Sequence, residues 1–248
     1  MTAIDDIDWA VISLKRTPER LAWFLAMNPG HGLPLETLEA VDGRTLPREE
    51  LVRLGFIEDG LAWNAGGIGA ALSHRICWQR AADTGRPIGV FEDDVALRSD
   101  FARQIPGLID AMPADWDIVL LGYNTDSILD VEVAPGCRMR CTFTMKTPTI
   151  DDCIRFAQGA GPVAPIRLHQ TFGSCAYLVS PKGAARLIDL TFPLTDQATN
   201  IPALGFAVSA KSQDALANGF YGVVQAFACV PPLALPHNDK ATSTVWVD

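Results

Sequence analysis

Short apolar runs alternate with amphipathic segments along most of this 248-residue chain, and the alternation predicts an α/β fold. Buried strands are expected where a short apolar run ends at charged or turn-forming residues, at 9–14, 88–91, 116–122, 175–179 and 221–230. Helices are expected where apolar residues recur at helical spacing, at 17–28, 47–54, 68–83, 101–112 and 181–188. Strands that alternate with helices favour a mixed, mostly parallel sheet with helices on both of its faces.

Other segments have weaker patterns. Leu38–Val41 predicts a short strand closed by the turn pair Asp42-Gly43, and Gly66–Gly69 predicts a flexible turn. The pattern fades over 123–171, where we expect long loops or short irregular strands, and the stretch 191–218 is mixed.

The composition is that of a globular protein with a sizeable core, because 48% of the residues are hydrophobic. No repeat, low-complexity tract or linker interrupts the sequence, so we expect a single domain over residues 1–248. The net charge of −9 argues against a nucleic-acid partner, because phosphate backbones select basic surfaces. The N-terminus is too polar for a signal peptide, and the apolar stretch 220–235 is too short to span a bilayer. We expect a cytoplasmic protein, with peripheral contact at the inner membrane left open.

The six cysteines do not form a recognisable metal or redox motif. None belongs to a C-x-x-C pair, and Cys137 and Cys141 have no histidine or second pair at zinc-site spacing. We therefore expect free, mostly buried thiols in a reducing compartment.

Three consecutive carboxylates, Glu92, Asp93 and Asp94, follow the apolar run 88–91. In a strand alternate side chains share a face, so Glu92 and Asp94 are expected to point one way and Asp93 the other. Two aligned carboxylates at a strand end can hold a hard divalent cation, which in turn can hold a diphosphate. The alternative is a solvated acidic turn, but the buried run before the triplet favours a position at the rim of the sheet.

Several polar residues follow candidate strands. They include Lys15, Asp42, the acidic triplet and residues 123–126. Ligands of α/β sheets bind outside the carboxyl ends of the strands, so we expect these residues to gather along one edge of the fold.

A set of motifs spread over most of the chain occurs in the order of a known family. The motifs are Val11-Ile12-Ser13-Leu14 with Arg16 and Arg20, Ala40-Val41-Asp42-Gly43, Gly66-Gly67-Ile68-Gly69 with Leu72-Ser73-His74 and Trp78, Phe91-Glu92-Asp93-Asp94-Val95, Trp116 to Gly122, Gly173 to Ser180 with Gly183-Ala184, and more weakly Asp214 ahead of Pro231-Pro232-Leu233. Together they resemble the family 25 glycosyltransferases, the group that includes bacterial lipooligosaccharide galactosyltransferases. The segments 125–170 and 191–213 match this family poorly.

The resemblance implies a GT-A-like nucleotide-diphospho-sugar transferase fold and an inverting, metal-dependent transfer of a hexose. The donor would be UDP-galactose or UDP-glucose, and the acceptor a sugar hydroxyl of a cell-surface glycan or glycolipid such as lipooligosaccharide. The acidic triplet corresponds to the metal-binding Asp-x-Asp motif of other such enzymes. It places Glu92 and Asp94 on the metal, Mn²⁺ or Mg²⁺, where the cation would offset the charge of the leaving diphosphate.

The remaining donor-binding candidates come from the same motifs. Lys15, Arg16 and Arg20 suit phosphate oxygens, although a solvated turn explains them as well. Asp42 is a candidate for the uracil or ribose, against a plain Asp-Gly turn, and Asp93 for the ribose or a backbone donor. Two further candidates lie on the expected helix 68–83, namely Ser73 and His74, of which His74 could also be a buried structural histidine.

An inverting transfer needs a general base for the acceptor hydroxyl. The candidates are Asp214, Asp196 and Asp126, and Asp214 fits the family pattern best. His237 is a further candidate for metal binding or for a lid, although a lone histidine beside proline is more often a surface residue.

Two other functions compete with the transferase. One is a metal-dependent phosphoryl or nucleotidyl transferase that uses the same acidic strand end, but a second carboxylate pair or a dedicated nucleophile does not stand out. The other is a catalytically inactive protein that binds a sugar nucleotide or serves as a scaffold. The intact Glu92 and Asp94 argue against it, whereas the long spacing before Asp214 favours it.

Overall fold

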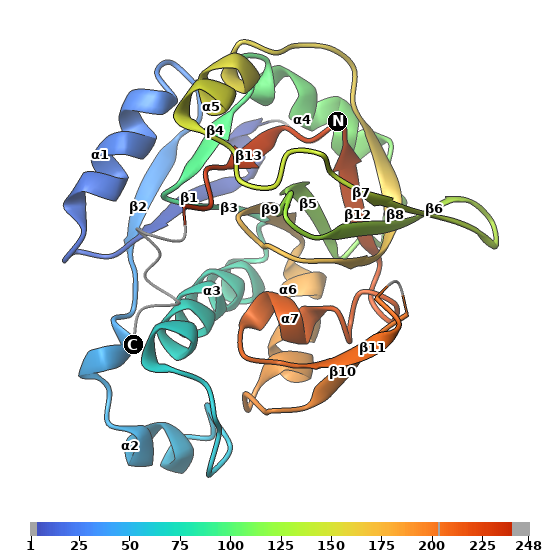
Figure 1. The fold of residues 1–248 in the computed structure, drawn as a ribbon. Helices are drawn as coiled ribbons and strands as arrows, with labels where there is room; N and C mark the ends of the chain where they lie inside the picture. The colour runs from blue at the N-terminus through green and yellow to red at the C-terminus, as the bar shows by residue number, and fades with distance from the viewer. Residues whose placement is uncertain (1–3, 203, 240–248) are drawn as a thin grey trace.

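The computed structural model describes residues 4–202 and 204–239, and these form a nine-stranded mixed sheet flanked by helices (Figure 1). Its strands are β1 (Asp8–Ser13), β2 (Leu35–Glu39), β3 (Ile88–Glu92), β5 (Ile118–Gly122), β6 (Ile128–Ala134), β7 (Cys137–Thr142), β8 (Ala164–Thr171), β9 (Ala176–Val179) and β12 (Ala226–Val230). They lie in the order β2-β1-β3-β9-β5-β12-β8-β6-β7. The pairs β1–β2, β1–β3 and β5–β12 are parallel, and the other pairs are antiparallel.

Helices cover both faces of this sheet. The longer ones are α1 (Pro18–Met27), α3 (Ala65–Thr84), α4 (Phe101–Asp110), α5 (Ile150–Ala157) and α6 (Pro181–Thr191). Shorter elements are η1 (Ile4–Asp6), η2 (Gly43–Thr45), α2 (Arg48–Arg53), α7 (Gln213–Ala217) and two small antiparallel pairs, β4 (Val95–Leu97) with β13 (Ala234–Pro236), and β10 (Ala198–Ile201) with β11 (Phe206–Ser209). The expected α/β fold with a mixed sheet between helices is confirmed, with a smaller parallel component than expected. The single-domain assignment stays a prediction.

The central strands are buried on both faces, which explains their continuous apolar runs. In β1, Trp9 and Val11 pack toward α1 and α4, whereas Ala10 and Ile12 pack toward α3 and α6. The strands β3 and β5 alternate in the same way. This double burial fixes the register of the strands whose ends carry the polar residues discussed below.

The expected flexible turn at Gly66–Gly69 is wrong, because these residues form the first turns of α3. The side chain of Asn64 accepts a hydrogen bond from the Gly67 amide at 2.7 Å and caps the helix. A Cβ at Gly69 would lie 2.5 Å from the Val41 carbonyl oxygen, so glycine lets the helix approach the loop after β2. The glycines therefore serve close packing rather than mobility.

Of the two alternatives for 123–171, long loops are wrong and strands are present, because this stretch contains β6, β7 and β8 with register shifts between them, together with the helix α5. The pattern is hidden in the β6–β7 hairpin by a buried carboxylate. Asp130 is fully buried and pairs with Arg138 at 2.7 Å and Arg140 at 2.9 Å across the hairpin. A charge at a buried position breaks the alternation from which strands are predicted.

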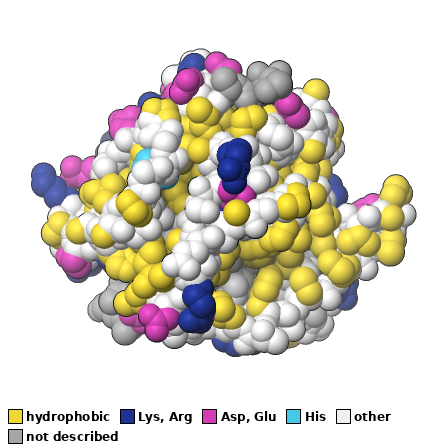
Figure 2. All heavy atoms as spheres, turned by 90° about the horizontal axis from the view of Figure 1, so that it is seen from above, with side chains coloured by type: hydrophobic (Ala, Val, Ile, Leu, Met, Phe, Trp, Pro, Cys, Tyr) yellow, Lys and Arg dark blue, Asp and Glu magenta, His cyan; other side chains and the backbone are white. Residues whose placement is uncertain are grey.

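Several large apolar side chains are exposed at the surface. Figure 2 shows many hydrophobic side chains on the face seen from above. The exposed large hydrophobic residues of the flanking elements include Leu25 of α1, Ile150 and Ile154 of α5, and Met139 of β7. Of the helices that the structure describes, none combines the length and apolar character needed to cross a bilayer. Peripheral membrane contact stays a prediction.

We predict opposite effects for two glycine-to-alanine substitutions. In β3, a Cβ at Gly89 would lie 2.2 Å from the ring of Trp9, which stacks on Phe91 at 5.6 Å. Gly89→Ala should therefore lower the free energy of unfolding by about 3 kcal/mol through overpacking. Gly107 of α4 has open space around it, so Gly107→Ala should raise this free energy by about 0.5–1 kcal/mol. Urea denaturation measures both, and equal stabilities would contradict the tight packing of Trp9 on β3.

Candidate active site

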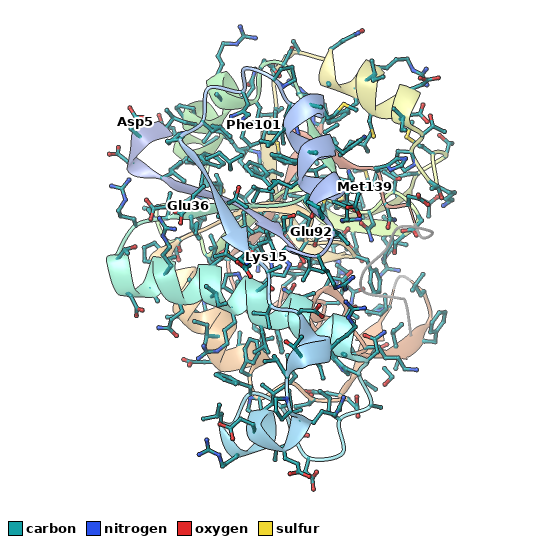
Figure 3. The ribbon with its side chains drawn as sticks, turned by 90° about the vertical axis from the view of Figure 1, so that its left-hand side faces the viewer. Asp5, Lys15, Glu36, Glu92, Phe101 and Met139 are labelled. Carbon is teal, nitrogen blue, oxygen red and sulfur yellow. The ribbon has the colours of Figure 1, made fainter. Side chains whose placement is uncertain are left out.

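Two adjoining cavities lie at the carboxyl ends of β1 and β3. The larger has a volume of about 730 Å³ and the smaller about 80 Å³. Both are lined by Arg20, His74 and Glu92. Because β1 and β3 are parallel neighbours, the residues that follow them come to the same edge of the sheet, where Figure 3 shows Lys15 and Glu92. The expected gathering of polar residues at one edge is therefore present.

The acidic triplet lies at the boundary between the two cavities. Glu92 and Asp94 line the larger cavity, and Asp93 lines the smaller one. The reason differs from the expected one, since β3 ends at Glu92 and the other two residues form a turn before β4. The turn, not strand alternation, separates Asp93 from its neighbours.

Arg20 of α1 holds this turn together. Its guanidinium lies 2.7 Å from Asp93 Oδ1 and 3.2 Å from Asp94 Oδ2. The other oxygen of Asp93 accepts a hydrogen bond from Ser13 Oγ at 2.7 Å. Burial opposes the charge of Arg20, but Asp94 and Asp93 outweigh it and raise the pKa of Arg20 above its usual range. The guanidinium therefore stays charged and balances the carboxylates around it.

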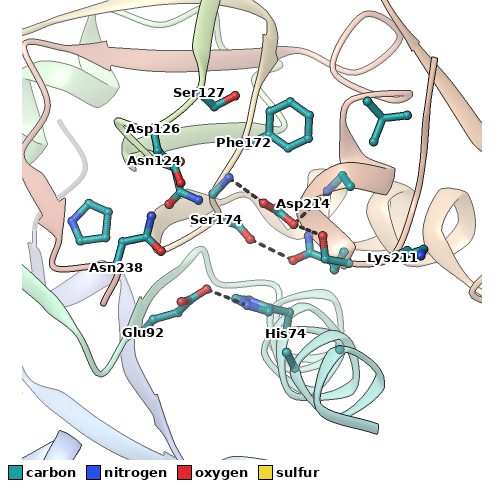
Figure 4. Close-up of a pocket in the computed structure, with 18 of the residues that line it drawn as sticks. His74, Glu92, Asn124, Asp126, Ser127, Phe172, Ser174, Lys211, Asp214 and Asn238 are labelled. Atoms are coloured by element: carbon teal, nitrogen blue, oxygen red, sulfur yellow. Dashed lines mark hydrogen bonds and ion pairs between the residues drawn. The ribbon is translucent and has the colours of Figure 1, made fainter. Parts of the chain in front are cut away.

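Glu92 pairs with a buried histidine. His74 Nε2 lies 3.6 Å from Glu92 Oε1 (Figure 4). His74 Nδ1 lies 2.9 Å from the hydroxyl of Tyr177, which also accepts a hydrogen bond from Trp78 Nε1 at 2.9 Å. The ionised carboxylate of Glu92 can only accept, so the Nε2 atom that faces it carries a proton, and in the corresponding neutral tautomer Nδ1 accepts from the Tyr177 hydroxyl. A structural histidine and a site residue, the two alternatives for His74, are thus combined in one side chain.

The two carboxylates that line the larger cavity differ in acidity. Burial, with the neighbouring charge of Glu92, raises the pKa of Asp94 to about 6. Burial also acts on Glu92, but the hydrogen bond and charge of His74 outweigh it and lower the pKa of Glu92. Glu92 is therefore ionised at neutral pH, and Asp94 is the group that a nearby cation would ionise fully.

The carboxylates of Glu92 and Asp94 fit a hard divalent cation that also keeps water or phosphate oxygens as ligands. Asp94 Oδ1 is buried and accepts no hydrogen bond from any residue that the structure describes. Within residues 4–202 and 204–239, no group of three or more His, Cys, Asp or Glu side chains is placed to hold a metal ion. Mg²⁺ is commonly bound through one or two carboxylates, with water and substrate phosphates as the other ligands. Glu92 and Asp94 match this arrangement, and a fully protein-bound metal site does not.

Asp42 and Ser73 line the smaller cavity. Asp42 accepts hydrogen bonds from Arg44 and Arg16, and the Arg44 contact is the main cause that lowers its pKa to about 2. The hydroxyl of Ser73 donates to the Gly69 carbonyl at 2.8 Å and accepts from the Val41 amide at 2.9 Å, so the backbone uses it.

The three predicted cations differ in their place at the site. Arg16 lines the smaller cavity, and Arg20 lines both cavities. Lys15 is exposed and is not among the residues that line either cavity.

The opposite wall of the larger cavity comes from the loop 172–174 and the start of α7. Asp214 Oδ2 accepts a hydrogen bond from the Gly173 amide at 2.9 Å, and its other oxygen accepts from Ser212 and from the Ala215 amide. Gly173 has a φ of +87°, and a Cβ there would lie 2.3 Å from the side chain of Asn124. Asp214 is thus fixed in orientation and faces Glu92 and His74 across the cavity (Figure 4).

Of the other candidates for the base or a metal ligand, one lines the larger cavity and two do not. Asp126 lines the larger cavity. Asp196 instead accepts a hydrogen bond from the Ala62 amide at 2.8 Å and is not among the lining residues. The ring of His237 stacks on Trp23 with the ring centroids 5.8 Å apart, and its backbone amide donates to the Asp94 carbonyl at 2.8 Å.

Sequence reasoning missed several lining residues of the larger cavity. They are polar or aromatic residues of segments without periodicity, namely Ser127, Phe172, Gln213 and Phe206. The available signal was the Gly173-Ser174 pair, since the Ser174 hydroxyl donates to Gln213 at 2.9 Å.

Comparison with known proteins identifies the family of this chain. The model of glycosyltransferase family 25, described as an LPS biosynthesis protein family, matches residues 7–202. The inactive glycosyltransferase 25 family member 3 of Mus musculus is 33% identical over 141 residues, which cover 51% of this chain and 24% of that protein. A glycosyltransferase 25 family member of Aedes aegypti is 30% identical over 123 residues, 45% of this chain and 20% of that protein. The chain thus spans about a quarter or less of the length of these curated relatives.

Among solved structures, A197 from STIV covers 90% of this chain and 81% of its own, at 10% identity and a TM-score of 0.39. A likeness at that level carries no argument. The family model, in contrast, includes the acidic triplet, Arg20, His74 and Asp42 within its matched span. The chain belongs to glycosyltransferase family 25.

Proposed function

We propose that this protein is an inverting, metal-dependent glycosyltransferase that moves galactose or glucose from a UDP-sugar to a sugar hydroxyl of a cell-surface glycan such as lipooligosaccharide. Family membership supports a glycosyltransferase, with a nucleotide-sugar donor and a glycan acceptor in general. The observation that carries the finer proposal is the buried Oδ1 of Asp94, which has no hydrogen-bond partner among the described residues and lies near Glu92 in a cavity of about 730 Å³. We place this activity in the cytoplasm, at or near the inner membrane.

In this proposal the nucleotide end of the donor lies toward the smaller cavity. Arg16 and Asp42 would contact the nucleoside, since both line that cavity. Arg20 lines both cavities, so its guanidinium can meet a diphosphate that passes from one to the other. The transferred hexose would then lie in the larger cavity, between the acidic turn and the opposite wall.

The chemistry follows from the charges at the two ends of the hexose. Mn²⁺ or Mg²⁺ held by Glu92 and Asp94 would supply Lewis-acid stabilisation of the leaving diphosphate. His74 directs its Nε2 proton toward Glu92 and so orients that carboxylate. On the far wall, the fixed carboxylate of Asp214 is our candidate for the base that takes the acceptor proton, and Asp126 is the alternative on the same cavity.

A second candidate function is binding of a sugar nucleotide without turnover. It is favoured by the similarity to a mouse relative that is named as inactive, and by the ion pair of Arg20 with Asp94, with which a metal ion would have to compete. Release of free hexose and UDP from UDP-galactose would support the transferase. Binding of UDP-galactose without release of hexose and UDP would support the inactive protein.

We predict that UDP-galactose with Mn²⁺ raises the melting temperature, and that Asp94→Ala abolishes the rise. At a ligand concentration of about 100 times Kd, binding should add about 2.7 kcal/mol to the free energy of unfolding. Asp110→Asn, an exposed change at the end of α4, is the matched control and should keep the full rise. Differential scanning fluorimetry with and without Mn²⁺ measures both. A full rise of the melting temperature in Asp94→Ala would contradict the assignment of Asp94 as a metal ligand.

The raised pKa of Asp94 predicts a pH-dependent effect of Asp94→Asn on the metal-free protein. An unfolded chain ionises Asp94 near pH 3.8 and the folded protein near pH 6, so ionisation destabilises the fold progressively between these values and fully above them. Asp94→Asn cannot ionise and should melt several degrees higher than the wild type at pH 7.5, with a smaller gain at pH 4.5. A gain that is equal at both pH values would contradict the buried environment of this carboxylate.

We predict that Asp214→Asn lowers kcat by about 100-fold or more, because the amide cannot accept the acceptor proton. Its amide oxygen can still accept the Gly173 hydrogen bond, and the donor-induced melting shift should persist. Asp126→Asn is the comparison variant. Transfer assays on both variants identify the base. A wild-type kcat in Asp214→Asn would contradict the assignment of Asp214. If Asp126→Asn is then the slow variant, Asp126 is the base.

A further inference from the structure

The larger cavity has an apolar wall that the chemistry of the donor does not use. We propose that this wall, formed by Phe172, Leu204, Phe206 and Val208, binds the acceptor as a pyranose ring whose C–H face lies on Phe206. That the bound saccharide is an acceptor rests on the proposed function. The binding of a saccharide to this wall can be tested without turnover. Carbohydrate rings have an apolar C–H face and a polar hydroxyl rim, and aromatic side chains bury the first while hydrogen-bonding groups meet the second.

The exposure of Phe206 is the first observation. It is 58% exposed at the start of β11, although β11 has a partner strand and an adjoining core. Opposite it in β10, Ile201 is fully buried, and Thr199 is also buried. The hairpin thus buries β10 and leaves the aromatic ring of β11 at the cavity. An exposed aromatic ring that lines a cavity is typical of a binding surface.

The wall is fixed, which a specific subsite requires. Gln170 of β8 donates from Nε2 to the Asn200 carbonyl of β10 at 3.0 Å. At the other end of the hairpin, a Cβ at Gly67 would lie 3.1 Å from the Lys211 carbonyl oxygen, so the chain after β11 packs against the first turn of α3. The hairpin is therefore tied to the sheet on one side and to α3 on the other.

The polar groups complete the complementarity to a sugar. Asn124, Asp126 and Ser127 line the same cavity, and Figure 4 shows them on the side of Phe172. The same view places Glu92 and His74 on the opposite side. A sugar ring on the Phe172 side of the cavity would therefore approach a donor hexose from the side away from the acidic turn. Inversion requires this direction, because the hydroxyl must attack opposite the leaving diphosphate.

The surroundings favour a sugar over a lipid chain or a partner protein. The cavity that continues from the wall is lined by the charged residues Glu92, Asp94, Asp126 and Asp214, which an acyl chain would leave unsolvated. The family model ends at residue 202, so Phe172 lies inside the matched span, whereas Leu204, Phe206 and Val208 lie outside it.

The test compares Phe206→Ala with Phe206→Tyr, and Val223→Ala is the control. Val223 is as exposed as Phe206, at 61%, but is not among the residues that line the cavity. The probes are methyl β-galactoside, methyl β-glucoside and lactose. Their binding to the unmodified full chain and to each variant is measured by saturation-transfer NMR. We expect wild type, Phe206→Tyr and Val223→Ala to bind at least one probe, and Phe206→Ala to bind it about tenfold more weakly.

A second readout separates this proposal from the proposed function. The melting shift with UDP-galactose and Mn²⁺, which reports donor binding, should persist in Phe206→Ala, because the proposal places Phe206 on the acceptor and not on the donor. Saccharide binding that is equal in Phe206→Ala and wild type, or absent for all three probes, overturns the subsite. If UDP-galactose and Mn²⁺ do not raise the melting temperature of the wild type, the proposed donor and metal are wrong. The saccharide-binding experiment still tests the apolar wall in that case.

Discussion

The ion pairs of Arg20 with Asp93 and Asp94 are the interaction on which the site depends. Three successive acidic side chains lie at one turn, and a buried charge without a partner costs several kcal/mol. Arg20 lies 2.7 Å from Asp93 and 3.2 Å from Asp94, and His74 approaches Glu92 from the other side. These contacts keep the carboxylates together while one oxygen of Asp94 stays without a donor among the described residues. The turn is thus stabilised without being neutralised.

The fold brings these groups together through the parallel pairing of β1 and β3. Ser13 ends β1 and Glu92 ends β3, so the two strand ends lie side by side and α1 returns Arg20 to the same place. The ring of Trp9 packs over Gly89, its register partner in β3. The same core that makes the strands predictable therefore positions the acidic turn.

The sequence predicted one half of the site better than the other, for a physical reason. Glu92, Asp94 and Asp42 follow apolar strands, and the topology of α/β sheets brings such residues to one edge. Phe206 lies in a short hairpin whose residues are partly exposed and show no periodicity, so only the coordinates reveal that it faces the cavity. The Gly66–Gly69 error has a different cause, since glycine near Asn64 serves close approach inside a capped helix. Local patterns report burial, and they miss groups whose environment is made by distant segments.

In the proposed reaction, the leaving group and the acceptor need different surroundings. A leaving diphosphate gains negative charge, so it is stabilised on the side that holds Arg20 and can hold a cation. An attacking hydroxyl loses a proton, so it needs a carboxylate that is kept in place, as Asp214 is by three donors. Asp214 and the apolar residues Phe172 and Phe206 line the same cavity as the acidic turn. In this proposal the acceptor ring therefore binds on the apolar wall, with Asp214 as the group that receives its proton.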